Sequence, residues 1–218
     1  MDVTNPQITT NGLFIALDGP DGAGKTTQAA RLVAWLEAQG LPVVACRDPG
    51  GTSLGDRVRQ ILLDRATGNL AVRAEMLLYM ASRAQLVEEV IRPALEAGRV
   101  VVSDRYLLAN VVYQGFAGDL PVEEVWSVGR AATGGLMPDL TLLIDVPPDV
   151  AQTRVGPPRD RIEDRPDAFR IRVREGFLKA AASYPAPIVI IDGSADPAAI
   201  ASRLQSEVAR ALALGPRP

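Results

Sequence analysis

The stretch with the clearest chemical potential is Gly19-Pro20-Asp21-Gly22-Ala23-Gly24-Lys25-Thr26, which matches the pattern Gly-x-x-x-x-Gly-Lys-Ser/Thr. Glycines let a loop turn its backbone N–H groups inward around an anion, so the pattern is typical of a loop that binds phosphate groups. Within it, we expect Lys25 to reach the outer phosphates of a nucleotide as a mobile cation. The hydroxyl of Thr26 is expected to hold a magnesium ion.

Two further apolar runs end in charged residues. The run 43–46 is followed by Arg47-Asp48-Pro49-Gly50-Gly51-Thr52, and the run 100–103 ends at Asp104. In open α/β sheets, ligands bind at the carboxyl ends of the strands. Asp104 is therefore expected to reach the magnesium end of the phosphate site, either directly or through a water molecule. Because Asp also commonly ends a strand, this assignment depends on the phosphate loop beside it.

The segments that must position these residues alternate between apolar runs and helix-like stretches. Residues 13–17 are apolar before the loop, and Ala29, Leu32, Val33 and Leu36 recur at helical spacing after it. A strand–loop–helix context favours a true phosphate-binding loop over a glycine-rich turn that happens to contain a lysine.

The same alternation continues along the chain and predicts the fold class. Further strands are expected at 43–46, 100–104, 140–145 and 188–191, and helices at 54–63, 71–97 with a kink or break at Pro93, 108–114, 121–132, 147–154, 166–184 and 197–214. Continuous apolar strands separated by helices are typical of a parallel sheet covered on both faces. We therefore predict an α/β fold with a five-stranded parallel β-sheet flanked by helices on both faces.

Composition limits the chemistry that is available. The 218 residues, 47% of them hydrophobic, suit one sizeable domain, and a net charge of −3 gives no global basic field for a nucleic-acid polymer. The sequence has no histidine, so any catalysis must use carboxylates, Lys, Arg, hydroxyls and a borrowed metal ion. The single cysteine, Cys46, cannot form an internal disulfide, which fits a reducing compartment.

The ends of the chain and one internal segment have a loop-like composition. Residues 1–11 are polar and lack the layout of a signal peptide, and no apolar stretch is long enough to span a bilayer. We therefore expect a cytoplasmic protein with no membrane partner, a flexible segment at 1–11 and a tail at 215–218. The segment at about 155–165 is charged and proline-rich, and it is expected to be a mobile loop.

Two classes of P-loop protein can be weighed from the motifs. A GTPase would offer an Asn-Lys-x-Asp stretch for reading guanine, and this sequence contains no Asn-Lys pair. The switch-type Asp-x-x-Gly is also missing, because Asp104 is followed by Arg105-Tyr106-Leu107. A nucleotide-sensing switch is therefore the weaker interpretation, although the sequence does not exclude it.

Five stretches in one order resemble the thymidylate kinase family of P-loop nucleoside monophosphate kinases, of the bacterial type with a basic lid. They are Asp21-Gly22-Ala23-Gly24-Lys25-Thr26-Thr27, Arg47-Asp48-Pro49-Gly50-Gly51-Thr52, Tyr79-Met80-Ala81-Ser82-Arg83-Ala84-Gln85, Asp104-Arg105-Tyr106 and Asp160-Arg161-Ile162-Glu163. The resemblance implies a P-loop NTPase fold, transfer of the γ-phosphoryl group of ATP to dTMP with Mg²⁺ in dTTP biosynthesis, and a homodimer. It also implies a single P-loop kinase domain at 12–214, with the charged loop at about 155–165 as its lid.

The resemblance also implies a set of site residues. The ATP site would be Gly19, Pro20, Asp21, Gly22, Ala23, Gly24, Lys25, Thr26 and Thr27, with Thr26 and Asp104 at the metal. The dTMP site would be Asp21, Arg47, Tyr79, Arg83, Arg105, Tyr106, Asn110 and Gln114. Catalysis would involve Lys25, Asp21, Arg105, Arg159 and Arg161.

Each implied role in the acceptor site has a physical reason. Asp21 would accept a hydrogen bond from the 3′-hydroxyl, although a carboxylate there also suits a helix cap. The planar guanidinium groups of Arg47 and Arg105 would each bind two oxygens of the acceptor phosphate. Tyr79 would stack on thymine, unless it is simply a core aromatic, and Arg83 would donate to a base carbonyl from the same helix face.

The remaining acceptor roles concern the base edge and the sugar. An amide both donates and accepts, so Asn110 suits the imide edge of a pyrimidine, and Gln114 lies one turn further along. Tyr106 is expected to crowd the sugar and disfavour a ribose 2′-hydroxyl. Two departures from the family pattern affect this region: Asp48 stands where a glutamate is frequent, and Leu108 and Ala109 replace residues that are often polar.

The charged loop is expected to supply the catalytic cation. Some relatives carry an arginine inside the phosphate loop, where this chain has Gly22. The candidates are therefore Arg159, Arg161 and Arg165, with Arg154 at the entrance to the loop, and the sequence does not decide among them. By analogy with arginine fingers, such a residue contributes ~10³–10⁵ in rate. A merely solvated basic loop and a different nucleotide or deoxynucleoside kinase remain alternatives.

Overall fold

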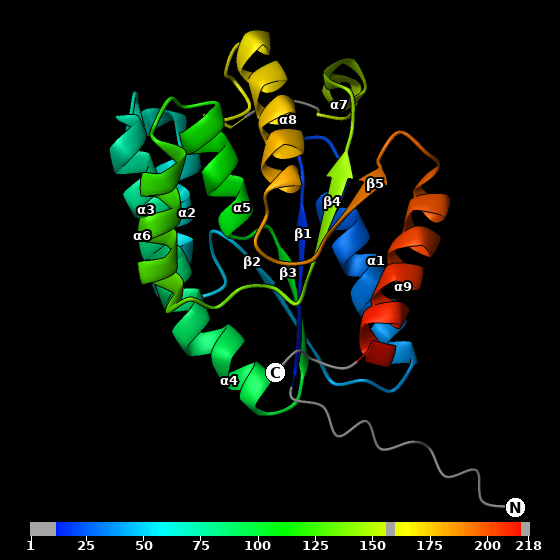
Figure 1. Ribbon diagram of the computed structural model, residues 1–218. Helices are drawn as coiled ribbons and strands as arrows, with labels where there is room; N and C mark the ends of the chain where they lie inside the picture. Colours follow the sequence, from blue (N-terminus) through cyan, green and yellow to red (C-terminus); the bar gives the residue numbers. More distant parts are fainter. Residues whose placement is uncertain (1–11, 156–159, 215–218) are drawn as a thin grey trace, which may run out of the picture.

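The computed structural model describes residues 12–155 and 160–214 (Figure 1). The flexible segment expected at 1–11, the tail at 215–218 and the part of the expected lid at 156–159 lie outside the described residues. The predicted division into a flexible segment at 1–11, one domain at 12–214 and a tail at 215–218 therefore stays a prediction. Among the described helices, none has both the length and the apolar composition needed to cross a bilayer.

The described part of the chain is built on one parallel sheet of five strands, as the alternating pattern predicts. The strands are β1 (Leu13–Asp18), β2 (Val43–Arg47), β3 (Val100–Asp104), β4 (Leu140–Asp145) and β5 (Ile188–Asp192). Their order in the sheet is β2-β3-β1-β4-β5, which places β1 at the centre. The chain moves to one side of β1 for β2 and β3 and to the other for β4 and β5, so β1 marks the switch point of the sheet.

Helices cover both faces of the sheet (Figure 1). They are α1 (Lys25–Ala38), α2 (Ser53–Leu63), α3 (Val72–Leu86), α4 (Arg92–Glu96), α5 (Leu107–Asn110), α6 (Val122–Thr133), α7 (Pro148–Arg154), α8 (Asp167–Ala182) and α9 (Pro197–Leu214), with a 3₁₀ turn η1 at Arg65–Thr67. Alternate residues of β1 point to opposite faces. Leu13, Ile15 and Leu17 pack with α1 and α9, whereas Phe14 and Ala16 pack with α3, α5 and α6. A further apolar cluster lies between β4, α5 and α8.

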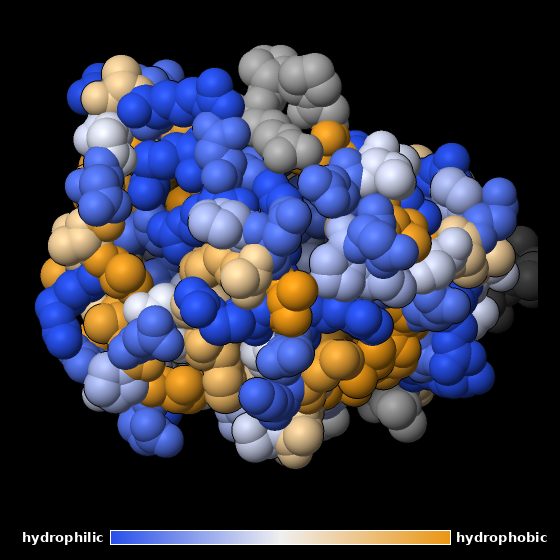
Figure 2. Space-filling model, turned by 90° about the horizontal axis from the view of Figure 1, so that it is seen from above, coloured by the Kyte–Doolittle hydropathy of each residue, from blue (hydrophilic) through white to orange (hydrophobic). Residues whose placement is uncertain are grey.

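Strand register brings the predicted site residues to one level of the sheet. Arg47 on β2 lies opposite Asp104 on β3, and Asp104 lies opposite Leu17 on β1. Because Asp18 and the phosphate loop follow Leu17 directly, the carboxyl ends of three neighbouring strands converge on one place. Figure 2 views this end of the molecule from above, and hydrophilic side chains cover much of the face, with smaller apolar areas between them.

Two predicted helices are interrupted by π-helical turns. The predicted helix 71–97 divides into α3, a π-helical turn η2 at Val87–Ile91 and α4, with Pro93 in the first turn of α4. Proline has no N–H and its ring crowds the carbonyl four residues earlier, so the regular helical pattern cannot pass through it. The predicted helix 108–114 is α5 continued by a second π-helical turn, η3, at Val111–Phe116. Such turns are frequent at functional sites.

Candidate active site

The phosphate loop has the backbone that its glycines predict. Gly19, Gly22 and Gly24 all have positive φ angles, of 145°, 80° and 86°. A Cβ atom at Gly19 would lie 2.2 Å from the carbonyl oxygen of Ile144, and one at Gly22 would lie 2.4 Å from that of Ala151. Because α1 begins at Lys25, its N-terminal N–H groups and its dipole face the loop. The loop and the helix terminus together fit an anion such as a phosphate group.

The metal pair predicted from the sequence is assembled at the start of α1. The hydroxyl of Thr26 donates to Oδ2 of Asp104 over 2.6 Å, and Nζ of Lys25 donates to the carbonyl oxygen of Pro20 over 2.7 Å. A hydroxyl and a carboxylate supply the hard oxygen ligands that Mg²⁺ prefers. Within the described residues, no group of three or more His, Cys, Asp or Glu side chains forms a complete metal cage. Thr26 and Asp104 therefore fit a magnesium ion and would supply part of its oxygen ligands.

Burial shifts the pKa values of two charged side chains beside the phosphate loop, Lys25 and Asp18. Burial, together with the neighbouring Arg105, lowers the pKa of Lys25 to about 8. Burial raises the pKa of Asp18 to about 7 against the opposing pull of Arg105, and neither carboxyl oxygen of Asp18 has a hydrogen-bond partner among the described residues. An entering phosphate group would favour the charged form of Lys25.

Arg105 is held over the phosphate loop by an unusual backbone conformation. Its φ angle is 73°, in the left-handed region that non-glycine residues rarely adopt, and its N–H donates to the carbonyl oxygen of Leu17 over 2.9 Å. Its Nη1 donates to the carbonyl oxygen of Gly19 over 3.0 Å, and its Nη2 donates to Oδ1 of Asp21. The strained residue thus aims a guanidinium group at the site, which is where backbone strain is commonly retained.

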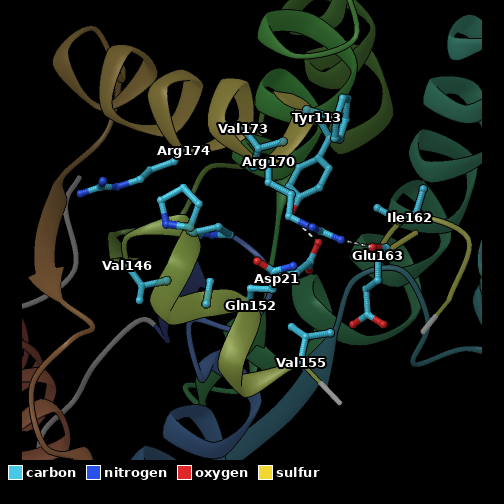
Figure 3. Close-up of a pocket in the computed structure, with 14 residues that line it drawn as sticks. Asp21, Tyr113, Val146, Gln152, Val155, Ile162, Glu163, Arg170, Val173 and Arg174 are labelled. Atoms are coloured by element: carbon cyan, nitrogen blue, oxygen red, sulfur yellow. Dashed lines mark hydrogen bonds between the residues drawn. The ribbon is translucent and has the colours of Figure 1, made fainter. Parts of the chain in front are cut away.

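Tyr113 completes this cluster, and Figure 3 shows Tyr113 and Asp21 pointing toward one another. The Tyr113 hydroxyl donates to Oδ2 of Asp21 over 2.8 Å, and the guanidinium of Arg105 lies 5.3 Å from the centre of the Tyr113 ring. Burial by itself would raise the pKa of Asp21, but Arg105 and Lys25 outweigh it, so that the pKa is lowered. Asp21 is therefore an ionised acceptor at the rim of the site.

One cavity of about 540 Å³ joins the phosphate loop to the ends of β2 and β3. Its lining includes most of the predicted site residues: Asp21, Gly22, Gly24, Lys25, Thr26, Thr27, Arg47, Tyr79, Arg83, Asp104, Arg105, Asn110 and Gln114. Gly19, Pro20 and Ala23 belong to the loop but not to the lining of this cavity. The predicted donor and acceptor residues thus share one continuous space.

Tyr106 lies elsewhere. Its ring is fully buried, edge-on to Phe14 at 4.9 Å between ring centres, and its hydroxyl donates to the carbonyl oxygen of Leu136 over 3.0 Å. It does not line the cavity, so its position does not support the sugar contact expected of it. Tyr113, three residues beyond Asn110, lines the cavity instead. That helical spacing was the one sequence signal for Tyr113.

The lid arginines that the structure describes are bound to a buried carboxylate. Arg161 and Arg165 both donate to Glu75, over 2.6 Å and 2.7–2.9 Å, and neither lines the cavity. Arg159 lies outside the described residues. Arg154, at the end of α7, does line the cavity, while its Nη1 donates to the carbonyl oxygen of Gly193 over 2.8 Å. Arg161 therefore attaches the charged loop to Glu75 and does not reach the cavity beside the phosphate loop.

Sequence reasoning also missed Arg59 and Glu75. Arg59 on α2 lines the cavity and donates to the carbonyl oxygen of Pro49 over 3.1 Å. Burial and the neighbouring Arg47 lower the pKa of Arg59. No motif marks either residue, because an isolated charge on a helix usually indicates a solvated face.

A second, more apolar cavity lies behind Asp21 and Tyr113, between α7 and α8 (Figure 3). Val146, Val155 and Ile162 contribute to its lining, and Arg170 of α8 donates to the carbonyl oxygen of Glu163 over 2.6 Å. The segment after Asp160 is thereby attached to α8 on one side and to Glu75 on the other.

The family model and the curated relatives that match this chain point to the same family. The thymidylate kinase family model matches residues 17–203. A thymidylate kinase of Bifidobacterium longum (strain NCC 2705) is 46% identical over 201 residues, which cover 91% of this chain and 98% of the relative. One from Clavibacter sepedonicus is 44% identical over 207 residues, covering 94% and 98%, and one from Caldanaerobacter subterraneus subsp. tengcongensis is 46% identical over 183 residues, covering 84% and 88%.

The matched range runs from the end of β1 into α9, so it includes the phosphate loop, all the strand ends that carry site residues and the segment after Asp160. With its five-stranded parallel sheet and this agreement along the sequence, the chain belongs to the thymidylate kinase family.

Proposed function

We propose that this protein is a dTMP kinase, which transfers the γ-phosphoryl group of ATP to dTMP and yields dTDP and ADP. The observation that carries the proposal is the shared cavity, which is lined by Lys25 and Thr26 of the phosphate loop and also by Tyr79 and Asn110. Membership of the thymidylate kinase family supports the same activity. Phosphoryl transfer requires a donor and an acceptor in one water-poor space, and this cavity offers both ends of it.

The donor end would bind ATP together with Mg²⁺. The loop N–H groups and Lys25 would hold the phosphates, and the contact between Thr26 and Asp104 supports a metal site at this point. When bound, Mg²⁺ would neutralise charge on the phosphate oxygens. The transfer then needs little covalent help from the protein, because catalysis is mainly positioning and charge stabilisation.

The phosphate of the acceptor would lie among the arginines. Arg47 and Arg105 stand at the ends of neighbouring strands, as the register of β2 and β3 requires, and Arg59 adds a third guanidinium to the same lining. Planar guanidinium groups suit bidentate contacts with phosphate oxygens. Since Arg161 is bound to Glu75, the catalytic cation would come from Arg154, which already lines the cavity, or from Arg159.

The sugar and the base would lie between Asp21 and α3. A carboxylate has about four acceptor positions, so Asp21 can accept from a 3′-hydroxyl while it still binds Arg105 and Tyr113. Tyr113 would then flank the sugar, in the role that Tyr106 does not occupy. Oδ1 of Asn110 is buried with no hydrogen-bond partner in the described part of the chain. It would accept a hydrogen bond from N3–H of thymine.

We also propose that the protein is a cytoplasmic homodimer that binds neither nucleic-acid polymers nor membranes. Exposed apolar side chains on two helices that pack together, Leu54 and Ile61 on α2 and Leu77 on α3, support an interface on this side. The net charge of −3 gives no support for a polyanionic partner.

Release of ADP from Mg²⁺–ATP across a panel of acceptors tests the activity. We expect fast turnover with dTMP and negligible turnover with AMP, GMP or thymidine. One methyl group in an apolar pocket is worth roughly 10–200-fold, so dUMP should be poorer than dTMP by that factor in kcat/KM. Equal rates with dUMP and dTMP would contradict a pocket fitted to thymine. If no acceptor stimulates ADP release from folded protein, the activity is wrong, and a nucleotide-sensing switch becomes the better interpretation.

Tyr79→Ala tests the stacking assignment. Tyr79 lines the cavity from α3, so we expect its loss to raise the apparent KM for dTMP by about 5–150-fold while the KM for ATP changes little. The estimate is the ~1–3 kcal/mol of a base–aromatic stack. Tyr184→Ala is a matched control, because Tyr184 packs against Trp126 and does not line the cavity. Equal effects of Tyr79→Ala on both substrates would identify Tyr79 as a core residue only.

A further inference from the structure

A chain of three buried polar side chains runs from α3 to the base end of the cavity. Glu75, Gln114 and Asn110 are 0%, 1% and 2% exposed. Nε2 of Gln114 donates to Oε1 of Glu75 over 2.8 Å, and Nδ2 of Asn110 donates to Oε1 of Gln114 over 2.6 Å. The chain ends at Oδ1 of Asn110, which is buried and has no hydrogen-bond partner among the described residues.

The direction of this chain is fixed at its Glu75 end. Both oxygens of Glu75 accept hydrogen bonds from guanidinium groups, Oε1 from Arg165 and Oε2 from Arg161 and Arg165. A carboxylate held in this way only accepts, so Gln114 must turn its amide nitrogen toward Glu75. Its oxygen then faces Asn110.

The same logic fixes Asn110. Because Oε1 of Gln114 is an acceptor, the amide nitrogen of Asn110 must face it. The Asn110 oxygen therefore lies on the side of the amide away from Gln114, in a residue that lines the cavity. An amide alone presents either a donor or an acceptor, depending on how it is turned. Here the buried charge of Glu75, two side chains away, removes that freedom.

We propose that Glu75 and Gln114 are positioning residues that set the base specificity of the acceptor site, by holding Asn110 with its oxygen toward the base. The inference rests on the proposed role of Asn110 in reading thymine. N3 of thymine carries a hydrogen and donates, whereas N3 of cytosine accepts. The fixed oxygen of Asn110 therefore suits thymine and opposes cytosine, since two acceptors would meet there without a proton between them.

Arg83 contributes to the same discrimination in another way. A guanidinium group can only donate, so Arg83 favours a base carbonyl over an amino group whatever the state of Gln114. Loss of the hydrogen-bonded series Glu75–Gln114–Asn110 should therefore weaken the preference for thymine over cytosine without abolishing it. The residues that fix the direction, Arg161 and Arg165, come from the described part of the proposed lid, so Asn110 is linked to residues 160–165 through Gln114 and Glu75.

The test compares dTMP with 5-methyl-dCMP, which keeps the methyl group and changes only the hydrogen-bonding edge of the base. Glu75→Gln replaces the carboxylate with an amide, which has one oxygen and one amino group. Either of these groups can then face Gln114. Gln114→Met removes the middle of the chain while leaving the ion pairs of Glu75 in place, and it remains informative if Glu75→Gln does not fold. Glu124→Gln is the matched control, a helical carboxylate that binds Arg73 outside the cavity.

In both Glu75→Gln and Gln114→Met, we expect the ratio of kcat/KM for dTMP to that for 5-methyl-dCMP to fall by about 10-fold or more. The fall should come mainly from faster turnover of 5-methyl-dCMP, because Asn110 can then turn its amide nitrogen to the base. Damage to packing alone would lower both values together and leave the ratio unchanged, as should Glu124→Gln.

Asn110→Ala separates failure of this inference from failure of the role on which it rests. If Asn110→Ala lowers the ratio but Gln114→Met and Glu75→Gln leave it unchanged, the inference is wrong and Asn110 remains the base reader. If Asn110→Ala leaves the ratio unchanged, Asn110 does not read the base, and both the proposed role and the inference are overturned. Circular dichroism of each variant verifies that it is folded.

Discussion

Lys25→Ala is expected to lower kcat/KM for phosphoryl transfer by at least about 10³-fold and to leave the fold intact. The magnitude follows from the loss of a positioned cation at the place where charge develops, which costs ~10²–10³ for a neutral donor and more for a charged one. Lys25 is buried, and its Nζ donates to the carbonyl oxygen of Pro20. Burial lowers its pKa to about 8, so the charge is costly to keep there without a ligand and its removal should not destabilise the protein.

Steady-state ADP release with saturating dTMP measures this loss, and thermal unfolding monitors the fold. The sequence offers a matched control, because its only other lysine, Lys179, is exposed on α8 and lies outside the cavity. Lys179→Ala should retain turnover within about 2-fold, as expected for a surface substitution. Near-normal turnover in folded Lys25→Ala would remove the phosphate loop from the mechanism.

The sheet and the strand-end residues could be predicted because their signals are local. An apolar run predicts a strand, and glycines or a charged residue directly after the run mark the carboxyl end of that strand, where ligands bind. Parallel strands bring their carboxyl ends to one edge of the sheet. Arg47 and Asp104 directly follow or end such a run, Lys25 closes the glycine loop after another, and all three line one cavity. The family motifs reinforced the same positions.

The parts that could not be predicted depend on helix phase and on distant contacts. Spacing arguments assume 3.6 residues per turn, but η3 is π-helical, which alters the faces reached by residues after Asn110. Tyr113 lies in η3 and lines the cavity, whereas Tyr106 precedes α5 and is buried in the core, so the order of residues along the chain did not show which tyrosine reaches the site. The anchoring of Arg161 by Glu75 joins residues 86 positions apart, for which a single sequence carries no signal.

Asp48→Ala is expected to destabilise the protein by ~3–5 kcal/mol, the cost of leaving one partner of a buried ion pair uncompensated. Arg83 and Asp48 are 1% and 2% exposed, and Nε of Arg83 donates to Oδ2 of Asp48. Burial raises the pKa of Asp48 although Arg83 opposes the change, which indicates how strongly this place disfavours charge. For a domain of this size we expect the Tm to fall by about 10 °C.

Urea denaturation measures the free energy of unfolding, and two further variants identify the cause of any loss. Glu124→Ala removes the partner of Arg73 in an exposed pair, where the side chains are 34% and 57% exposed, and should cost at most about 1 kcal/mol. The double variant Asp48→Ala/Arg83→Met should be more stable than Asp48→Ala alone, because the unpaired charge is gone and methionine fills much of the space. A cost below about 1 kcal/mol for Asp48→Ala would mean that Arg83 finds other compensation. The Asp48 carboxylate would then not be what holds Arg83 at the base end of the cavity.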